Sequence, residues 1–558
     1  MSHCNRAPGD LSLPCTARCT SVSRSGRCGT ARWAMADKRW RTGWHALTLI
    51  LGCAPAAAPG PDAAGGDAAV AVPDTGLDSV AVASLDSNGR GTNKGLLLSG
   101  TVVTPHESFV GQVLVVGKTI VCAQAGTVCA GRPEAAGVQT VDTKGVIVPG
   151  LIDMHNHILF DIFDGDDWLP LQSYTDHTQW PKEARYGAML DVKQCLENAS
   201  QGKPSWCMAP YNTKDGNLKC EMDKWGELKG LIAGTTSIVG LPGTAAGCFH
   251  SLSRSIDTAH NDLAVDNVQT SALFPPSKEA ADGVCKNFSS GVTAAYLIHC
   301  GEGINPLALS EFSTLQTIST KDGCLLAPGT VITHGTAFGA AEFAAMKAND
   351  TKLTWSPASN VALYGDTANI PLALDAGLTI SLGPDWSMGG SQNMLDELRF
   401  ADNWDNTHWN NRLTPRELVI MATANGALSL GMGDKLGKIA TGYLADLFVV
   451  DGDPSKPWEA VLAATPQQVQ LVMVNGVVLY GDAALGGLGP FSPGCEGLTV
   501  CGREKFVCVA EDSSVDKLNQ TLNDIRSALQ TALEAVDAAT LSDGWHFAPL
   551  TPLVKCAK

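Results

Sequence analysis

The sequence predicts an α/β protein whose main body is a (β/α)8 barrel of the TIM type. One observation is the apolar segment Gly145–His157, which ends in His155 and His157. Another is a series of short apolar segments that each end in a reactive polar residue, at 294–302, 330–335, 353–360 and 378–385. In a (β/α)8 barrel the carboxyl ends of all strands meet on one face. The sequence therefore predicts a single site on that face.

The rest of the chain is predicted to surround this barrel. Short alternating β segments before and after it indicate a small β-sandwich built from both sides, and apolar residues at helical spacing indicate helices near the C-terminus. The predicted order is a signal segment at 1–53, a flexible linker at 54–93, a first β-sandwich segment at 94–148, the barrel at 149–433, a second β-sandwich segment at 434–485 and a C-terminal helical extension at 486–558. Weakly marked strands two and three of the barrel are predicted at Thr235–Gly240 and near Asn267–Leu273.

His155 and His157 are the first candidate metal ligands. Side chains two residues apart on a strand leave the same face, so both imidazoles can reach one ion. Two histidines at the end of a buried strand need partners for their ring nitrogens, and a divalent metal supplies one. Hydrogen-bonded structural histidines are the alternative that this spacing leaves open.

Five motifs occur in a fixed order along the chain. They are Pro-Gly-Leu-Ile-Asp-x-His-x-His at 149–157, His-x-x-Glu at 299–302, a lone His334, Ser-Pro-x-Ser-Asn at 356–360 and Gly-x-Asp at 383–385. With these motifs the chain resembles the metal-dependent amidohydrolase superfamily, in the branch that contains triazine hydrolases, guanine deaminase and adenosyl-nucleoside deaminases. The resemblance extends from about Leu96 to Asp482.

The resemblance implies a role for each motif residue. It implies that His155, His157, His299 and Asp385 bind one divalent metal ion, zinc or alternatively iron. Glu302 would be the proton shuttle, His334 would contact the polarised group of the substrate, and Asp385 would also act in catalysis. Three imidazoles and one carboxylate suit Zn2+ or Fe2+ on chemical grounds as well, and such an ion activates water near neutral pH. The structural alternatives are a solvated carboxylate for Glu302, a packed histidine for His334 and a turn-capping aspartate for Asp385.

Two departures from the family pattern matter. No lysine stands at the end of a plausible fourth strand, so a carbamylated lysine bridging two metals has no candidate, and one metal ion is expected. Trp355 stands where several deaminases of this branch have histidine. Trp355 is either a wall of the pocket or a core aromatic residue.

The predicted function is hydrolysis of a non-peptide C–N bond in a small molecule, by deamination or by opening a cyclic amide or amidine. A chlorohydrolase or a dipeptide-like amide hydrolase using the same residues is the alternative among enzymes. From a different class, the chain could be a surface-anchored binding lipoprotein without catalytic activity. The acidic and aromatic segment Leu159–Trp180 is expected either to overhang the pocket or to be an ordinary surface loop.

Charge and the N-terminal pattern limit the partners. The formal net charge of −17 disfavours nucleic acid and anionic membrane surfaces. The apolar run Trp44–Leu51 follows basic residues, and Ile50–Cys53 resembles a lipobox, which predicts a bacterial, extracytoplasmic protein anchored by a lipid at Cys53. Met35 is an alternative start, and a cytosolic tail with a chance cysteine is the competing interpretation. The sequence leaves the oligomeric state open, with a homodimer as one option.

Cysteine usage is consistent with export. Thirteen cysteines follow Cys53, and an odd number leaves at least one of them free. Close spacing predicts local disulfides between Cys122 and Cys129, between Cys207 and Cys220, and between Cys495 and either Cys501 or Cys508. Cys300 is expected to serve packing.

Overall fold

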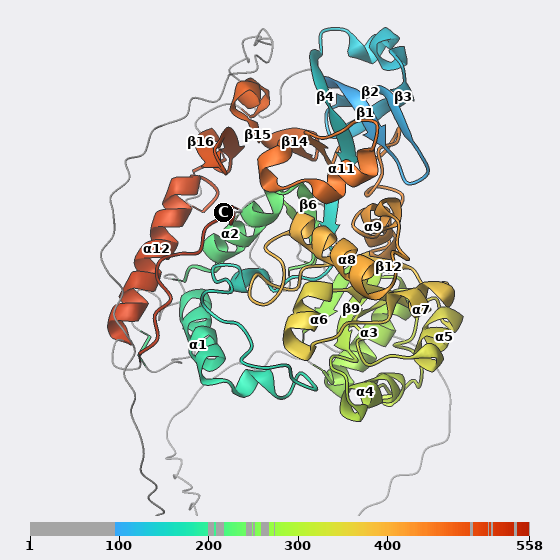
Figure 1. Ribbon diagram of the computed structural model, residues 1–558, viewed down its shortest axis with the longest axis vertical. Helices are drawn as coiled ribbons and strands as arrows, with labels where there is room; N and C mark the ends of the chain where they lie inside the picture. Colours follow the sequence, from blue (N-terminus) through green and yellow to red (C-terminus); the bar gives the residue numbers. More distant parts are fainter. Residues whose placement is uncertain are drawn as a thin grey trace, which may run out of the picture. The chain divides into compact units, whose positions relative to one another are not determined.

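The computed structural model describes an α/β fold (Figure 1). The described residues are 95–198, 206–207, 217–240, 248, 252–257, 267–272, 274–490, 495–511, 513–514, 517–540 and 544–556. The predicted signal segment, Cys53 and the whole predicted linker lie outside this range. No described helix is both long enough and apolar enough to cross a membrane.

Eight parallel strands form the centre of the fold. They are β5 (Leu151–Asp153), β6 (Thr235–Ile238), β7 (Arg254–Ser255), β8 (Val268–Ser271), β9 (Ala295–Cys300), β10 (Thr330–His334), β11 (Lys352–Trp355) and β12 (Ile380–Leu382). The first three pair as one sheet and the last five as another, in chain order. Predicted strand two corresponds to β6, but predicted strand three is β8, the fourth of the series, because the two-residue strand β7 carries no recognisable apolar run.

The two parallel sheets meet where the site residues lie. The Met154 N–H donates to the Leu382 carbonyl at 3.1 Å, and an isolated parallel bridge joins Asn156 to Asp385. These contacts bring β5 beside β12, as in a barrel. No ladder joins β7 to β8 within the described part of the chain, so a closed barrel is not detected there.

Most helices follow the strands that they cover. In chain order they are α1 (Ala184–Asn198), α2 (Lys219–Leu231), α3 (Lys278–Ser290), α4 (Pro306–Thr317), α5 (Ala340–Ala348), α6 (Pro357–Tyr364), α7 (Ile370–Asp375), α8 (Met394–His408), α9 (Pro415–Met421) and α10 (Ala424–Ser429). Each of α4, α5 and α6 begins shortly after the carboxyl end of its strand. Polar residues in the intervening turns are therefore held at the same end of the sheet.

The segments on either side of the barrel combine in one nine-stranded sheet. Its strands are β1 (Leu96–Val103), β2 (Ser108–Val116), β3 (Thr119–Ala125), β4 (Gln139–Pro149), β13 (Leu447–Val450), β14 (Val469–Val474), β15 (Val477–Asp482), β16 (Cys495–Val500) and β17 (Arg503–Cys508). Antiparallel pairing of β4 with β13 joins the two segments, and the remaining strands extend the ladder on both sides. The predicted small β-sandwich is therefore not confirmed, because hydrogen bonds run continuously through one sheet. Strands β16 and β17 also occupy some of the region predicted to be helical.

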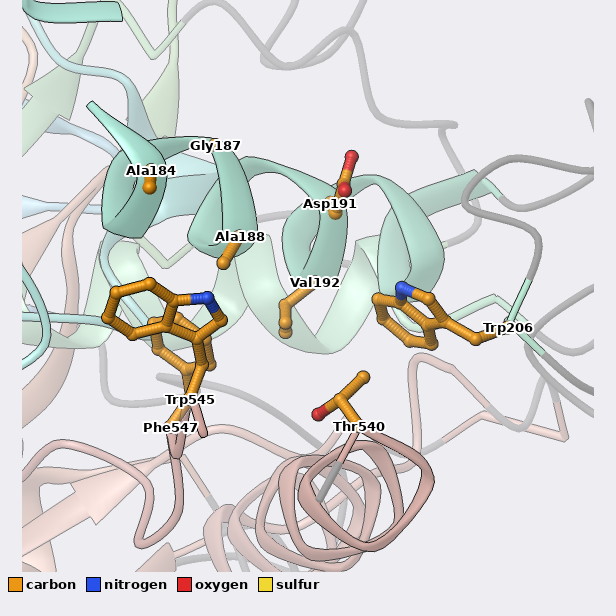
Figure 2. Close-up of a pocket in the computed structure, with 9 residues that line it drawn as sticks. All are labelled: Ala184, Gly187, Ala188, Asp191, Val192, Trp206, Thr540, Trp545 and Phe547. Carbon is orange, nitrogen blue, oxygen red and sulfur yellow. The ribbon is translucent and has the colours of Figure 1, made fainter. Parts of the chain in front are cut away.

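The C-terminal region packs on α1 and α2. Helix α12 (Leu522–Ala539) begins at a capping box formed by Thr521 and Asp524, and its apolar face is buried. A cavity of about 320 Å³ lies between α1 and this region, with Trp206, Thr540 and Trp545 among its lining residues (Figure 2). It lies apart from the residues singled out by the sequence motifs.

Six disulfides link the described cysteines. They are Cys122–Cys129, Cys195–Cys207, Cys220–Cys248, Cys285–Cys324, Cys495–Cys508 and Cys501–Cys556. The predicted Cys122–Cys129 bridge is confirmed, as is Cys495 with Cys508. The predicted pairing of Cys207 with Cys220 is wrong, because the fold places each of them beside a different cysteine. Cys300 is free and buried, as expected for a packing residue.

Candidate metal and catalytic site

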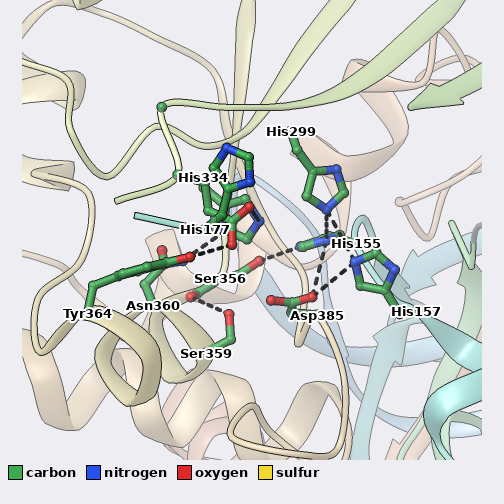
Figure 3. Close-up of polar contacts among 12 residues, drawn as sticks. His155, His157, His177, His299, His334, Ser356, Ser359, Asn360, Tyr364 and Asp385 are labelled. Atoms are coloured by element: carbon green, nitrogen blue, oxygen red, sulfur yellow. Dashed lines mark hydrogen bonds and ion pairs between the residues drawn. The ribbon is translucent and has the colours of Figure 1, made fainter. Parts of the chain in front are cut away.

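Four side chains from three strand ends converge on one point (Figure 3). His155 and His157 follow β5, His299 is on β9, and Asp385 follows β12. The Nε2 atom of His299 lies 3.0 Å from Nε2 of His155 and 3.2 Å from Nε2 of His157. The Asp385 Oδ1 atom lies 3.4 Å from each of the latter two nitrogens.

These distances fit a tetrahedral metal shell. Ligand atoms that lie 2.0 to 2.1 Å from a tetrahedral zinc are about 3.3 Å from one another. Hydrogen bonding explains the cluster less well, because Nε2 of His299 can share at most one proton while it faces two other imidazole nitrogens. The arrangement therefore suits a cation at the centre.

Contacts behind the imidazoles prepare them as ligands. Nδ1 of His299 lies 3.0 Å from the carbonyl oxygen of Ser271, which can only accept, so Nδ1 carries the proton and Nε2 keeps a lone pair. Nδ1 of His155 lies 2.9 Å from the Ser356 hydroxyl. Burial lowers the pKa of His299 to about 4 and lowers the pKa of His155 and of His157 well below the usual value, so all three rings are neutral at neutral pH.

The backbone is unusual at two site residues. His334 has φ 74° and Asp385 has φ 73°, both in the left-handed region that residues other than glycine seldom adopt. Each stands at the carboxyl end of its strand or just beyond it. Such conformations concentrate at functional sites, where surrounding structure holds them in place.

Glu302 lies beside this cluster, and its two carboxylate oxygens contact different residues. Oε1 accepts a hydrogen bond of 2.6 Å from the Tyr364 hydroxyl, and Oε2 lies 3.7 Å from Nε2 of His334. The indole N–H of Trp180 donates to the same Tyr364 oxygen at 3.1 Å. Because Tyr364 accepts from Trp180, its own proton points to Oε1, and Oε2 is the oxygen that faces His334. Burial raises the pKa of Glu302 to about 7.

The segment after β5 folds over the site. An antiparallel bridge joins Asp176 to Gly303, and the His177 N–H donates to the Glu302 carbonyl at 3.3 Å. The His177 ring lies 2.7 Å from a carboxylate oxygen of Glu311, whose hydrogen bond raises the pKa of His177. The segment Leu159–Trp180 thus lies directly beside Glu302.

Aromatic side chains gather next to His157. They are Phe160, Trp168, Trp180, Tyr186 and Trp386, all of them buried. The Trp386 ring centroid lies 5.6 Å from that of His157 and 5.3 Å from that of Trp180. The rings pack mostly edge-on against one another beside the histidine cluster.

Sequence reasoning missed several residues of this site. His177 and Tyr364 belong to none of the motifs, although Tyr364 ends the helix that the Ser-Pro-x-Ser-Asn motif begins. Trp355 is fully buried, as expected for a core aromatic residue.

Comparisons with known proteins agree with this geometry. Residues 285–479 match the family model described as "Amidohydrolase family". The chain is 26% identical over 392 residues to 5-methylthioadenosine/S-adenosylhomocysteine deaminase of Halobacterium salinarum, which covers 66% of this chain and 89% of that protein. It is 23% identical to 5'-deoxyadenosine deaminase of Methanococcoides burtonii, over 73% of this chain and 90% of that protein.

A solved structure shares the fold. Atrazine chlorohydrolase from Arthrobacter aurescens TC1, complexed with zinc, superposes with a TM-score of 0.51 and 18% identity, over 69% of this chain and 95% of that chain. At this identity the likeness concerns the TIM-barrel-type α/β fold alone. Together with the family model and the curated relatives, the site supports placing the chain in the amidohydrolase superfamily. The family model and the deaminase relatives support a hydrolase that acts on C–N bonds other than peptide bonds.

Proposed function

We propose that the protein is a metal-dependent deaminase that removes an amino group from a planar nitrogen heterocycle, such as the purine ring of an adenosine-like nucleoside. The observation that carries the proposal is the convergence of His155, His157, His299 and Asp385 at 3.0 to 3.4 Å beside a buried Glu302. The deaminase relatives support the choice of substrate class.

We propose zinc as the ion, held by those four residues, with iron as the alternative. Three neutral imidazoles and one carboxylate are a donor set that both ions accept. When bound, the ion supplies Lewis-acid activation of water. The same donor set, with no bridging lysine, supports one ion per chain.

Glu302 moves the proton that the reaction requires. Water adds to the ring carbon that bears the amino group, the C=N electron pair moves to the ring nitrogen, and one proton of the water passes to Oε2 of Glu302. The same oxygen delivers that proton to the amino nitrogen, the C–N bond breaks and ammonia leaves. The remaining hydroxyl proton moves to the ring nitrogen, which leaves a ring carbonyl. A pKa of about 7 suits a group that must both take and release a proton near neutral pH.

The remaining residues hold the substrate and exclude water. The aromatic group beside His157 provides a flat surface against which a heterocycle can stack, with Trp386 adjoining Asp385 in sequence. The docked segment around His177 closes the site next to Glu302. Excluding bulk water strengthens each polar contact within the site.

Substrate turnover tests the proposal. Purified protein loaded with zinc should release ammonia from at least one member of a panel of adenosine-type nucleosides, free purines, pyrimidines and aminotriazines. Hydantoins, N-acyl amino acids and a chlorotriazine serve as comparison substrates. Turnover of only a comparison substrate would replace deamination with amide or C–Cl hydrolysis at the same site.

A further inference from the structure

A chain of buried hydrogen bonds leads to the far side of the His334 ring. Nδ1 of His334 lies 2.9 Å from Nδ2 of Asn360, and Oδ1 of Asn360 accepts from the Thr367 hydroxyl at 3.2 Å. The indole N–H of Trp355 donates to that hydroxyl oxygen at 2.8 Å. His334, Asn360, Thr367 and Trp355 are all buried, so bulk water does not compete for these contacts.

The direction of this chain follows from the group at its start. An indole N–H can only donate, so the Thr367 oxygen accepts from Trp355 and its single hydroxyl proton is free for Asn360. Oδ1 of Asn360 receives that proton, which turns the amide nitrogen towards His334. Turning the amide over would cost the Thr367 hydroxyl its acceptor in a buried position.

We propose that Trp355, Thr367 and Asn360 are positioning residues that hold His334 as the neutral tautomer with its proton on Nε2. A donor facing Nδ1 requires a lone pair there. The proton on Nε2 then points to the side of the ring where Oε2 of Glu302 lies at 3.7 Å. This inference rests on the proposed function for its consequence, because the N–H can hydrogen-bond to the oxygen that attacks the substrate.

The same chain of hydrogen bonds determines which histidines can bind the ion. By distance alone, His334 could complete a cluster with His155 and His299, just as Asp385 does with His155 and His157. Nδ1 of His299 lies against a carbonyl oxygen, so His299 offers a lone pair at Nε2. Nδ1 of His334 lies against an amide N–H, so His334 carries a proton at Nε2 instead. Opposite partners behind two neighbouring rings therefore make one a ligand and the other a donor.

Nitrogen-15 NMR of the full chain tests the tautomer directly. The protein is labelled with 15N-histidine, the His334 signals are assigned by their loss in His334→Gln, and long-range proton–nitrogen spectra are recorded with and without added zinc. We expect a protonated Nε2 and an unprotonated Nδ1 in both samples. A protonated Nδ1, or an unprotonated Nε2 once zinc is added, would overturn the proposal.

Two variants test how the tautomer is set. Asn360→Asp places an acceptor against Nδ1 and should reverse the tautomer, while Thr367→Val removes the constraint on the amide and should produce a mixture. Thr367→Ser keeps the hydroxyl and should restore the original form. Asn369→Asp, the same chemical change at the exposed cap of α7, is the matched control and should leave His334 unchanged. An unchanged His334 tautomer in both Asn360→Asp and Thr367→Val would overturn the proposed role of this hydrogen-bond chain.

Kinetics separate this inference from the proposed function. On an identified substrate, Asn360→Asp should lower kcat about 10²-fold, the usual effect of removing one donor to the reacting oxygen, with little change in KM. If no tested heterocycle is deaminated, the proposed function fails, while the NMR result still decides the tautomer. If deamination is found but His334 carries its proton on Nδ1, only the present inference fails.

Discussion

The hydroxyl of Tyr364 donates a hydrogen bond of 2.6 Å to Oε1 of Glu302 while it accepts one of 3.1 Å from the indole N–H of Trp180. Burial raises the pKa of Tyr364 well above its usual value, so the hydroxyl keeps its proton. The contact therefore has a fixed direction, and it gives the two oxygens of Glu302 different tasks. Trp180 belongs to the segment after β5, so this segment takes part in the hydrogen bonding around Glu302.

Glu302→Gln should lose turnover by about 10²- to 10⁴-fold, the usual contribution of a general acid/base. The amide keeps the shape and much of the hydrogen bonding but cannot transfer a proton. Metal content, measured by elemental mass spectrometry, should stay at the wild-type level. Glu342→Gln, in the capping box of α5, is the control and should keep full activity. Near wild-type turnover in Glu302→Gln would place the proton shuttle on another residue.

Tyr364→Phe should shift the pH profile of kcat/KM to higher pH. Burial raises the pKa of Glu302, and the Tyr364 hydrogen bond opposes this rise because it stabilises the ionised form. The resulting pKa of Glu302 is about 7. Without the bond, that pKa rises further. The first proton transfer requires ionised Glu302, so activity increases as pH rises through this pKa. The acidic limb of the variant's profile should therefore lie at higher pH than that of the wild type. A limb that stays in place, or moves to lower pH, would contradict the orientation of Glu302 described above.

Replacing any one of His155, His157, His299 and Asp385 by alanine should reduce the bound metal well below one equivalent per chain. Three remaining ligands leave an incomplete shell and weaken binding. The exposed His408→Ala is the control and should bind metal like the wild type. Unchanged occupancy in one variant would remove that residue from the ligand set, and two ions per wild-type chain would refute a mononuclear site.

Cys501→Ser should lower the melting temperature by several degrees in calorimetry without reductant. The Cys501–Cys556 disulfide spans 55 residues, and a loop of that length contributes about 4 kcal/mol in the chain-entropy account. Cys556→Ser should give the same shift, and the double variant should add nothing, because each change breaks the same bond. A larger loss in the double variant would show that the cysteines stabilise the protein separately.

Lipid attachment at Cys53 stays a prediction from sequence. Labelled fatty acid should be incorporated when the gene is expressed in a bacterium that processes lipoproteins, and Cys53→Ala should abolish both the label and membrane association. Cys28→Ala is a matched change outside the lipobox pattern and should keep the label. Recovery of unlabelled protein with an intact N-terminus from the soluble fraction would refute the prediction.

Much of the site could be predicted because its residues lie at or just after the carboxyl ends of strands. His155 and His157 come directly after β5, and the parallel strands β9 and β12 carry His299 and Asp385 to the same edge. The positions of the candidate metal ligands and of Glu302 thus follow from local sequence combined with a regular fold. Strand β7, only two residues long, gave no such signal, which displaced the numbering of the predicted barrel strands.

Other features depended on contacts that no local pattern encodes. The sequence by itself determined the strands that end in reactive residues, the order of the motifs and the class of chemistry, since these depend on short-range periodicity. Only the tertiary structure decided that one sheet continues through β4 and β13, that Cys207 pairs with Cys195, and that His177 and Tyr364 reach Glu302. It also decided where the protons of His299 and His334 lie, because a ring nitrogen takes its role from whichever donor or acceptor the fold places against it.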